Sequence, residues 1–206
     1  MSRWFPQPHD AQPPRPVALL RGAVLALASL ALASPAAAKP AAPVAVARTL
    51  EADGTTTLVH EALIDAPPAA VWQAISTPEG WMRWAVPVAW ASPAEPDMLE
   101  TSYDPADTPG SPSTIRHQFL ARIPGRLLAF RTVKAPDGFP HFDIYRTVTS
   151  VFELEPAGNQ TRLRLTSTGY PDNEGGRALL AFFETGNAET LEALQKLFAG
   201  EAPVGE

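Results

Sequence analysis

The sequence predicts an α+β fold, in which an antiparallel sheet packs against one long helix near the C-terminus. Between residues 55 and 170, several short segments alternate apolar with polar side chains and are separated by turns rich in proline and glycine, as antiparallel strands are. From Arg177 to Phe198 the apolar residues instead recur about every three and a half positions, the period of an amphipathic helix. Strands followed by a segregated helix are typical of α+β packing.

The first expected strand covers residues 55–65, and a short amphipathic helix around Trp72 follows it. Pro68 suits the first turn of this helix, where a missing N–H needs no partner. Asp65 is placed to accept hydrogen bonds from the free N–H groups of that turn, so we expect it to act as the cap. The helix is expected to end before Pro78, because the residue that precedes a proline avoids the helical conformation.

The clearest hairpin joins residues 114–123 to residues 126–134 around the turn Pro124-Gly125. Loops rich in proline, glycine and aspartate are expected at residues 104–113, 135–143 and 171–176. The other segments with strand patterns are residues 86–90, 98–103, 145–156 and 160–170.

Composition excludes several classes of function. The chain has 206 residues, a net charge of −6 and no lysine- or arginine-rich run, so a nucleic-acid partner is not expected. It has no cysteine, which excludes disulfides, thiolate metal sites, cysteine nucleophiles and lipoprotein anchors. Its four histidines lack the spacing of a metal site, and there is no glycine-rich phosphate loop. We therefore expect neither a metal nor another cofactor.

The first 38 residues have the organisation of a cleavable signal peptide. Several arginines precede the apolar run Ala23–Ala33, and the small residues Ala36 and Ala38 then supply a cleavage site after Ala38. The run is shorter than the roughly 20 residues of a membrane-spanning helix. The processed protein is therefore expected in the periplasm or the medium, without a stable transmembrane segment. A retained N-terminal membrane anchor is the alternative.

The sequence thus divides into four expected parts. Residues 1–38 form the signal peptide, and residues 39–54 are expected to be a leader or linker without secondary structure. Residues 55–200 form the folded domain, and residues 201–206 form a polar tail.

Seven segments of the chain carry a family resemblance: Ile64-Asp65-Ala66-Pro67, Val71-Trp72, Thr77-Pro78-Glu79-Gly80, Trp84, Pro124 to Phe130, Val151 to Leu154 and Thr161 to Leu165. With these segments the chain resembles the START-like superfamily, also described as polyketide cyclase/dehydrase and lipid transport. The resemblance spans roughly residues 58–198 and favours the branch related to the activator of the heat-shock ATPase. It implies a helix-grip fold, in which a curved antiparallel sheet wraps around the long C-terminal helix.

Members of this superfamily often keep an apolar pocket between the sheet and the long helix, so the resemblance implies one here. His117 and Asn187 are polar residues on predicted apolar faces and therefore need a hydrogen-bonding partner or a ligand. Phe139 lies in a loop with two prolines and is expected either to cover the mouth of the pocket or to pack on the sheet edge. Each aromatic candidate has the alternative of ordinary core packing. The candidate lining residues are Trp72, Trp81, Trp84, His117, Phe119, Phe130, Phe139, Phe152, Phe183 and Asn187.

Three functions remain open at this point. The first is an exported domain that binds a small hydrophobic molecule, either a lipid, a polyketide or an aromatic compound, without catalysis of its own. The second is an enzyme of the cyclase, aromatase or hydrolase kind that uses His117 as acid or base, paired with Glu100 or Tyr103. The third is a protein-interaction module, against which export argues, because the heat-shock ATPase and its nucleotide are cytosolic.

Overall fold

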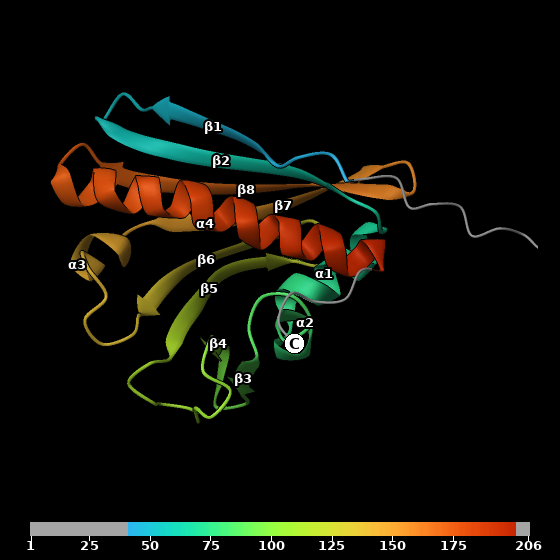
Figure 1. Ribbon diagram of the computed structural model, residues 1–206, viewed down its shortest axis with the longest axis horizontal. Helices are drawn as coiled ribbons and strands as arrows, with labels where there is room; N and C mark the ends of the chain where they lie inside the picture. The colour runs from blue at the N-terminus through green and yellow to red at the C-terminus, as the bar shows by residue number, and fades with distance from the viewer. Residues whose placement is uncertain (1–40, 201–206) are drawn as a thin grey trace, which may run out of the picture. The chain divides into compact units, whose positions relative to one another are not determined.

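A computed structural model describes residues 41–200 of the chain. These residues form one eight-stranded antiparallel sheet in the order β1-β2-β8-β7-β6-β5-β4-β3, followed by a long C-terminal helix, α4. Figure 1 shows the sheet curving around α4, with β1 and β2 on one side of the helix and β5 and β6 on the other. The predicted α+β helix-grip fold is therefore confirmed. The predicted signal peptide, its cleavage site and the tail at residues 201–206 lie outside the described residues.

The strands and helices follow the expected order along the chain. The strands are β1 (Ala45–Leu50), β2 (Thr55–Ile64), β3 (Val88–Ser92), β4 (Glu95–Ser102), β5 (Ile115–Ile123), β6 (Leu127–Lys134), β7 (Thr149–Ala157) and β8 (Gln160–Pro171). The helices are α1 (Pro68–Ser76), α2 (Pro78–Trp81), α3 (Phe142–Tyr145) and α4 (Glu174–Ala199).

Strand β1 lies inside the predicted linker, so the expectation of residues 39–54 without secondary structure is wrong. All six residues of β1 are exposed, and an exposed strand does not show the alternation of apolar and polar residues that reveals a half-buried one. Its stability comes from backbone pairing with β2, from Ala45 opposite Glu61 to Leu50 opposite Thr56. β1 is therefore an edge strand of the sheet.

Three local features also differ from the sequence prediction. Asp65 does not cap α1; the cap position is Pro67, which has no side-chain hydrogen bond. The turn that was expected after α1 is the short helix α2, capped by the Thr77 hydroxyl, which accepts from the Gly80 N–H at 3.0 Å. The strand predicted to begin at Tyr145 begins at Thr149, because residues 142–145 form a helical turn.

Helix α4 is anchored at the end of β8 by a close backbone contact. The Asn173 side chain caps the helix by accepting from the Gly176 N–H at 2.8 Å. A Cβ at Gly176 would lie 2.0 Å from the Pro171 carbonyl oxygen, so only glycine fits there. The 26 residues of α4 span about 39 Å at 1.5 Å per residue, which is enough to cross the sheet.

The core consists of two separate groups of buried residues. The tryptophan cluster contains Trp84 and buried residues from α1, most strands and the C-terminal half of α4, with Trp72 and Trp81 packed against it. The tyrosine cluster is smaller and lies at the other end of α4. It contains Leu58, Val148, Tyr170, Leu179 and Leu180, with Phe139, Ile144, Tyr145 and Phe183 packed against it.

Candidate ligand-binding site

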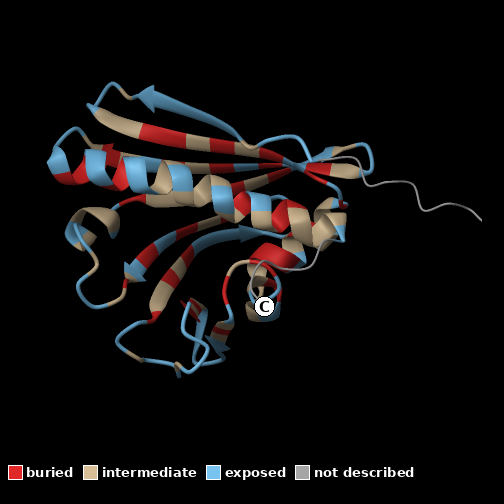
Figure 2. Ribbon diagram, in the orientation of Figure 1, coloured by how far each residue is buried: buried red, intermediate tan, exposed pale blue. Residues whose placement is uncertain are grey.

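The middle of α4 is not buried, although both of its ends are. Leu180 is 7% exposed before this segment and Leu191 is 1% exposed after it, but none of residues 181–190 is buried. Figure 2 shows buried residues toward both ends of α4 and intermediate exposure between them. Helical periodicity places Asn187 on the same stripe as Leu180, Leu191 and Leu194, yet Asn187 is only half-buried. The helix is therefore underpacked where its buried stripe crosses the sheet.

The position of α4 over the sheet explains this underpacking. The helix packs on β2, β8, β1 and α3, so its backbone covers one half of the sheet. Among the described residues, no helix backbone lies close to β4, β5 or β6, and side chains such as Trp81 of α2 and Tyr145 of α3 reach these strands instead. Beside the middle of α4, a Cβ built at Gly186 would meet no atom within 4 Å. We call the side chains of β5, β6 and α3 that face this part of the helix, together with those of the helix itself, the central site.

Thr132 connects the two core clusters at the central site. Its hydroxyl oxygen lies 3.2 Å from Nδ1 of His117 and donates to the Tyr145 hydroxyl at 3.1 Å. His117 and Thr132 are opposite each other on β5 and β6, so strand register positions this contact. Tyr145 reaches the same point from α3, where its ring stacks on Phe183 with centroids 4.5 Å apart.

His117 is an uncharged hydrogen-bonding group at neutral pH. Its ring lies between Trp81 and Phe130, with centroid distances of 5.5 and 5.6 Å. Burial disfavours the imidazolium and lowers the pKa of His117 to about 4. Because the Thr132 hydroxyl donates its proton to Tyr145, Nδ1 of His117 must be the protonated nitrogen that donates to Thr132. Nε2 then carries the lone pair, and the one hydrogen bond of His117 to a described residue is at Nδ1.

The sequence-predicted aromatic residues separate into two chains of ring contacts. Trp84, Trp81, His117, Phe130 and Phe152 contact one another in that order within the tryptophan cluster. Phe139 and Phe183 instead both contact Tyr145 in the tyrosine cluster. The predicted aromatic residues therefore belong to two groups of ring contacts and not to one continuous series.

Two other predicted residues lie away from the central contacts. Phe119 is 8% exposed and pairs with Phe130 across β5 and β6, and the Arg122 guanidinium lies 4.1 Å from its ring centroid. Trp72 is half-buried on α1.

The indole N–H groups of Trp81 and Trp84 have a structural role. They donate to the carbonyl oxygens of Ile75 and Ala74, at 2.7 and 2.9 Å. These carbonyls belong to the last turn of α1, where no intrahelical N–H is available. The two tryptophans therefore close the C-terminal end of α1, and Trp81 also contacts His117.

Sequence reasoning missed four polar residues of the sheet and of α3. Besides Thr132 and Tyr145, Ser150 and Ser167 face each other on β7 and β8 with hydroxyl oxygens 2.9 Å apart. Thr132 alternates with Leu128 and Phe130 on β6, which is the same signal of a polar residue on an apolar face that identified His117.

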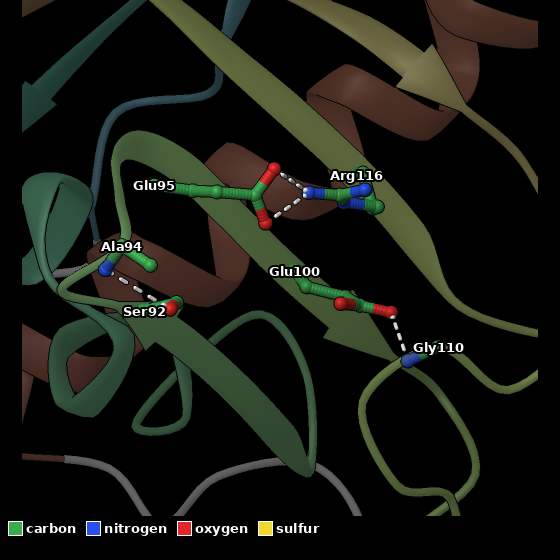
Figure 3. Close-up of polar contacts among 6 residues, drawn as sticks. All are labelled: Ser92, Ala94, Glu95, Glu100, Gly110 and Arg116. Atoms are coloured by element: carbon green, nitrogen blue, oxygen red, sulfur yellow. Dashed lines mark hydrogen bonds and ion pairs between the residues drawn. The ribbon is translucent and has the colours of Figure 1, made fainter.

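Neither expected acid–base partner of His117 forms a hydrogen bond with it. Leu99, and not Glu100, pairs with His117, so Glu100 belongs to the opposite face of the sheet. Figure 3 shows the Glu100 carboxylate accepting from the Gly110 N–H at 2.7 Å, beside the Glu95–Arg116 ion pair and the Ala94–Ser92 contact. Tyr103 is 69% exposed. Among residues 41–200, no carboxylate forms a hydrogen bond with His117.

Residues 41–200 contain neither a metal-binding cluster nor a membrane-spanning helix. No three histidine, aspartate or glutamate side chains gather closely enough there to hold a metal ion. No helix in that range is both long and apolar enough to cross a membrane.

Two surface hollows lie apart from the central site. One, of about 380 Å³, is on the outer face of β1, β2 and β8 and includes Glu61 and Arg164. The other, of about 250 Å³, lies between residues 41–43 and the last turns of α4. Neither contains any of the ten predicted site residues. The underpacked middle of α4, and not a wide preformed cavity, is therefore the observation that marks the site.

The fold and the sequence agree in the family they indicate. The profile described as polyketide cyclase / dehydrase and lipid transport matches residues 55–199. The chain belongs to this family. The match begins at the first residue of β2 and ends at the last residue of α4, so it covers the whole domain except the edge strand β1. The superfamily predicted from the sequence is thus confirmed.

Solved structures with the same fold include three bacterial proteins. A protein from Arthrobacter aurescens has 19% identity and a TM-score of 0.57, over 78% of this chain and 95% of its own. CalU16 from Micromonospora echinospora has 20% identity and a TM-score of 0.56, over 82% and 80%. The Aha1 dimer from Colwellia psychrerythraea has 18% identity and a TM-score of 0.54, over 69% and 96%. At these identities the similarity shows the fold alone. A comparison with curated proteins gave no match.

Proposed function

We propose that this protein binds a small hydrophobic molecule between the middle of α4 and the concave face of the sheet, without catalysing a reaction of its own. The observation that carries the proposal is the exposure of Asn187. This residue lies on the buried stripe of α4 and is nevertheless only half-buried. A helix that is packed at both ends and open in the middle leaves room for a guest molecule rather than for a side chain. Membership of a ligand-binding family supports the same interpretation.

The chemistry of the central site fits an apolar ligand. Its walls are the rings of Trp81, Phe130 and Phe183, and its polar groups are few and uncharged. Ligand pockets in proteins have this composition, in which apolar surface supplies affinity and a few polar groups fix orientation.

An acid–base enzyme is the second candidate, and one observation favours it. The lone pair on Nε2 of His117 is a base of suitable position at neutral pH. General catalysis would also need a group that returns the proton, and the nearest titratable hydroxyl, on Tyr145, is connected only through Thr132. We therefore place binding ahead of turnover. Consumption of a co-purified molecule by the wild-type protein, abolished in His117→Gln, would reverse this order.

Export is part of the proposal. A signal peptide that is cleaved after Ala38 would leave residues 41–44 in the processed protein. The Gln195 amide donates to the Ala42 carbonyl at 2.9 Å, and Val44 packs against the tryptophan cluster, so this segment contributes to the domain. Intact mass measurement of the protein from its native host should give an N-terminus at Lys39. An N-terminus at Met1 would support a retained anchor instead.

The binding proposal is tested by native mass spectrometry on the exported protein, followed by solvent extraction. We expect a co-purifying apolar molecule in the wild type. Asn187→Trp should displace it, because the new ring would point from the buried stripe of α4 into the underpacked space beneath the middle of the helix. Glu189→Trp adds the same ring at an exposed position of the helix and should retain the molecule. An unliganded mass, together with no binding to lipids or aromatic compounds, would contradict the proposal.

A further inference from the structure

We propose that the bound molecule is uncharged and carries a hydroxyl group, either a phenol or an alcohol, that donates a hydrogen bond to Nε2 of His117. This inference rests on the proposed function, because it concerns the ligand of the same site. It restricts the class of ligand in two ways: the ligand carries no charge, and it is the donor in one hydrogen bond to the protein.

The direction of the hydrogen bond follows from the chain His117–Thr132–Tyr145. Thr132 has one hydroxyl proton, and that proton is donated to Tyr145. The 3.2 Å contact between Thr132 and Nδ1 of His117 therefore uses the proton of Nδ1. A neutral imidazole has only one N–H, so Nε2 is an acceptor. A ligand group that reaches Nε2 must therefore be a donor.

The absence of buried charge sets the second condition. Among residues 41–200, no arginine, lysine, aspartate or glutamate is buried. A carboxylate or phosphate that entered the central site would lose its hydration without gaining an ionic partner, which is costly. Fatty acids and phospholipid headgroups therefore do not fit the site, whereas a neutral hydroxyl does.

Two cations of β5 and β6 are already engaged. The Lys134 ammonium donates to the carbonyl oxygens of Ser111 and Thr114, at 2.7 and 2.9 Å. The Arg122 guanidinium lies over the Phe119 ring and donates to the Pro96 carbonyl at 2.7 Å. Neither is free to neutralise an anionic ligand without breaking these contacts.

The Tyr145 hydroxyl adds a complementary donor. Because it accepts from Thr132, its own proton remains free, and no described residue receives it. Burial raises the pKa of Tyr145 to about 12, so this proton stays on the oxygen at neutral pH. This donor lies on the Nδ1 side of the imidazole, away from Nε2, so it would serve an acceptor elsewhere on the ligand and not the hydroxyl bound to His117.

The test compares three naphthalene probes of similar size by isothermal titration calorimetry on the intact exported protein at pH 7. 2-Naphthol carries a neutral hydroxyl, 2-methoxynaphthalene has no donor, and 2-naphthoate is an anion. We expect 2-naphthol to bind about tenfold more tightly than 2-methoxynaphthalene, the value of one hydrogen bond, and 2-naphthoate to bind most weakly.

Variants of the protein test whether the preference for 2-naphthol over 2-methoxynaphthalene comes from the proposed contact with His117. Thr132→Val removes the acceptor that holds the Nδ1 proton, and His117→Leu removes the acceptor for the ligand; both should reduce the tenfold preference to about one. Gln118→Ala changes the next residue of β5 on the outer face and should keep the preference. In nitrogen NMR of the wild type, the Nε2 signal of His117 should shift with 2-naphthol and not with 2-methoxynaphthalene, which a purely structural histidine would not do.

The outcomes separate the inference from the proposed function. Equal binding of all three probes, or tightest binding of 2-naphthoate, would overturn the inference and leave ligand binding in place. So would the identification of a carboxylate or a phosphate as the co-purified molecule. If none of the probes binds and no molecule co-purifies, the proposed function fails, and the inference fails with it.

Discussion

Nδ1 of His117 and the hydroxyl oxygen of Thr132 lie 3.2 Å apart, on residues that face each other across β5 and β6. This contact, continued to Tyr145, is the polar connection between a tryptophan-rich and a tyrosine-rich part of the core. It also fixes which nitrogen of His117 carries the proton, so the chemistry of the site depends on one threonine.

His117 should make stability depend on pH. Its pKa is about 4 in the folded protein and about 6.5 when unfolded, so between these values the unfolded chain binds the extra proton. The free energy of unfolding should therefore be highest above pH 6.5 and should decrease as the pH falls toward 4. At pH 5 this decrease should be about 2 kcal/mol. Urea denaturation at pH 7.5 and pH 5 measures this change.

His117→Gln is the control for this titration. Burial also lowers the pKa of His60, which acts in the same direction, so the variant should retain a smaller pH dependence. Identical pH dependence in the wild type and the variant would show that His117 is not buried in the neutral form.

Substitution of two glycines of α4 should have opposite effects. Gly186→Ala should raise the free energy of unfolding by about 0.5–1 kcal/mol, because alanine favours the helix and its Cβ enters open space. Gly176→Ala should lower it, because the Cβ would lie 2.0 Å from the Pro171 carbonyl oxygen. Thermal denaturation of both variants checks the sign. A destabilising Gly186→Ala would mean that the space beside α4 is filled.

The indole N–H of Trp84 should contribute measurably to stability. Trp84→Phe leaves the Ala74 carbonyl without its 2.9 Å donor in a buried position, and should cost about 1–3 kcal/mol. Trp72→Phe is the matched control, since the Trp72 indole donates to no described residue, and it should cost less. Chemical denaturation measures both changes; equal losses would indicate that ring volume, and not the hydrogen bond, decides.

The ion pair between Arg48 on β1 and Glu184 on α4 should contribute little. Both side chains are well exposed, at 45% and 35%, so solvent screens their attraction. A double-mutant cycle with Arg48→Ala and Glu184→Ala should give a coupling free energy below about 1 kcal/mol, which decreases in high salt. A larger, salt-independent coupling would show that the pair is shielded from solvent.

Much of the sheet could be predicted because its strands are half-buried. The β5–β6 hairpin and β8 alternate apolar and polar residues, and both segments form where the pattern indicated. β1 could not be predicted in this way, since its residues are all exposed and its pairing with β2 uses the backbone. Residues 142–145 lie where the predicted loop and the predicted strand meet, and there the chain makes a helical turn that neither pattern indicated.

The candidate site was predictable as a set of residues but not as an arrangement. His117 was identified because it interrupts an apolar face, and Trp81 and Phe130 do contact it. The division of the core into two clusters depends on which half of the sheet α4 covers, and no periodicity in one helix specifies that. The role of Tyr145 was hidden for the same reason, because α3 brings it to the sheet through tertiary packing alone.

The two separate anchors of α4 have a kinetic consequence. Because Leu179 and Leu180 hold one end and Leu191 and Leu194 hold the other, thermal motion can release one end while the other keeps its packing. A guest beneath the helix would then exchange with solvent at the rate of such partial opening, which is faster than global unfolding. The smaller tyrosine cluster has fewer buried residues to separate. The N-terminal end of α4 should therefore detach from the sheet before the C-terminal end does.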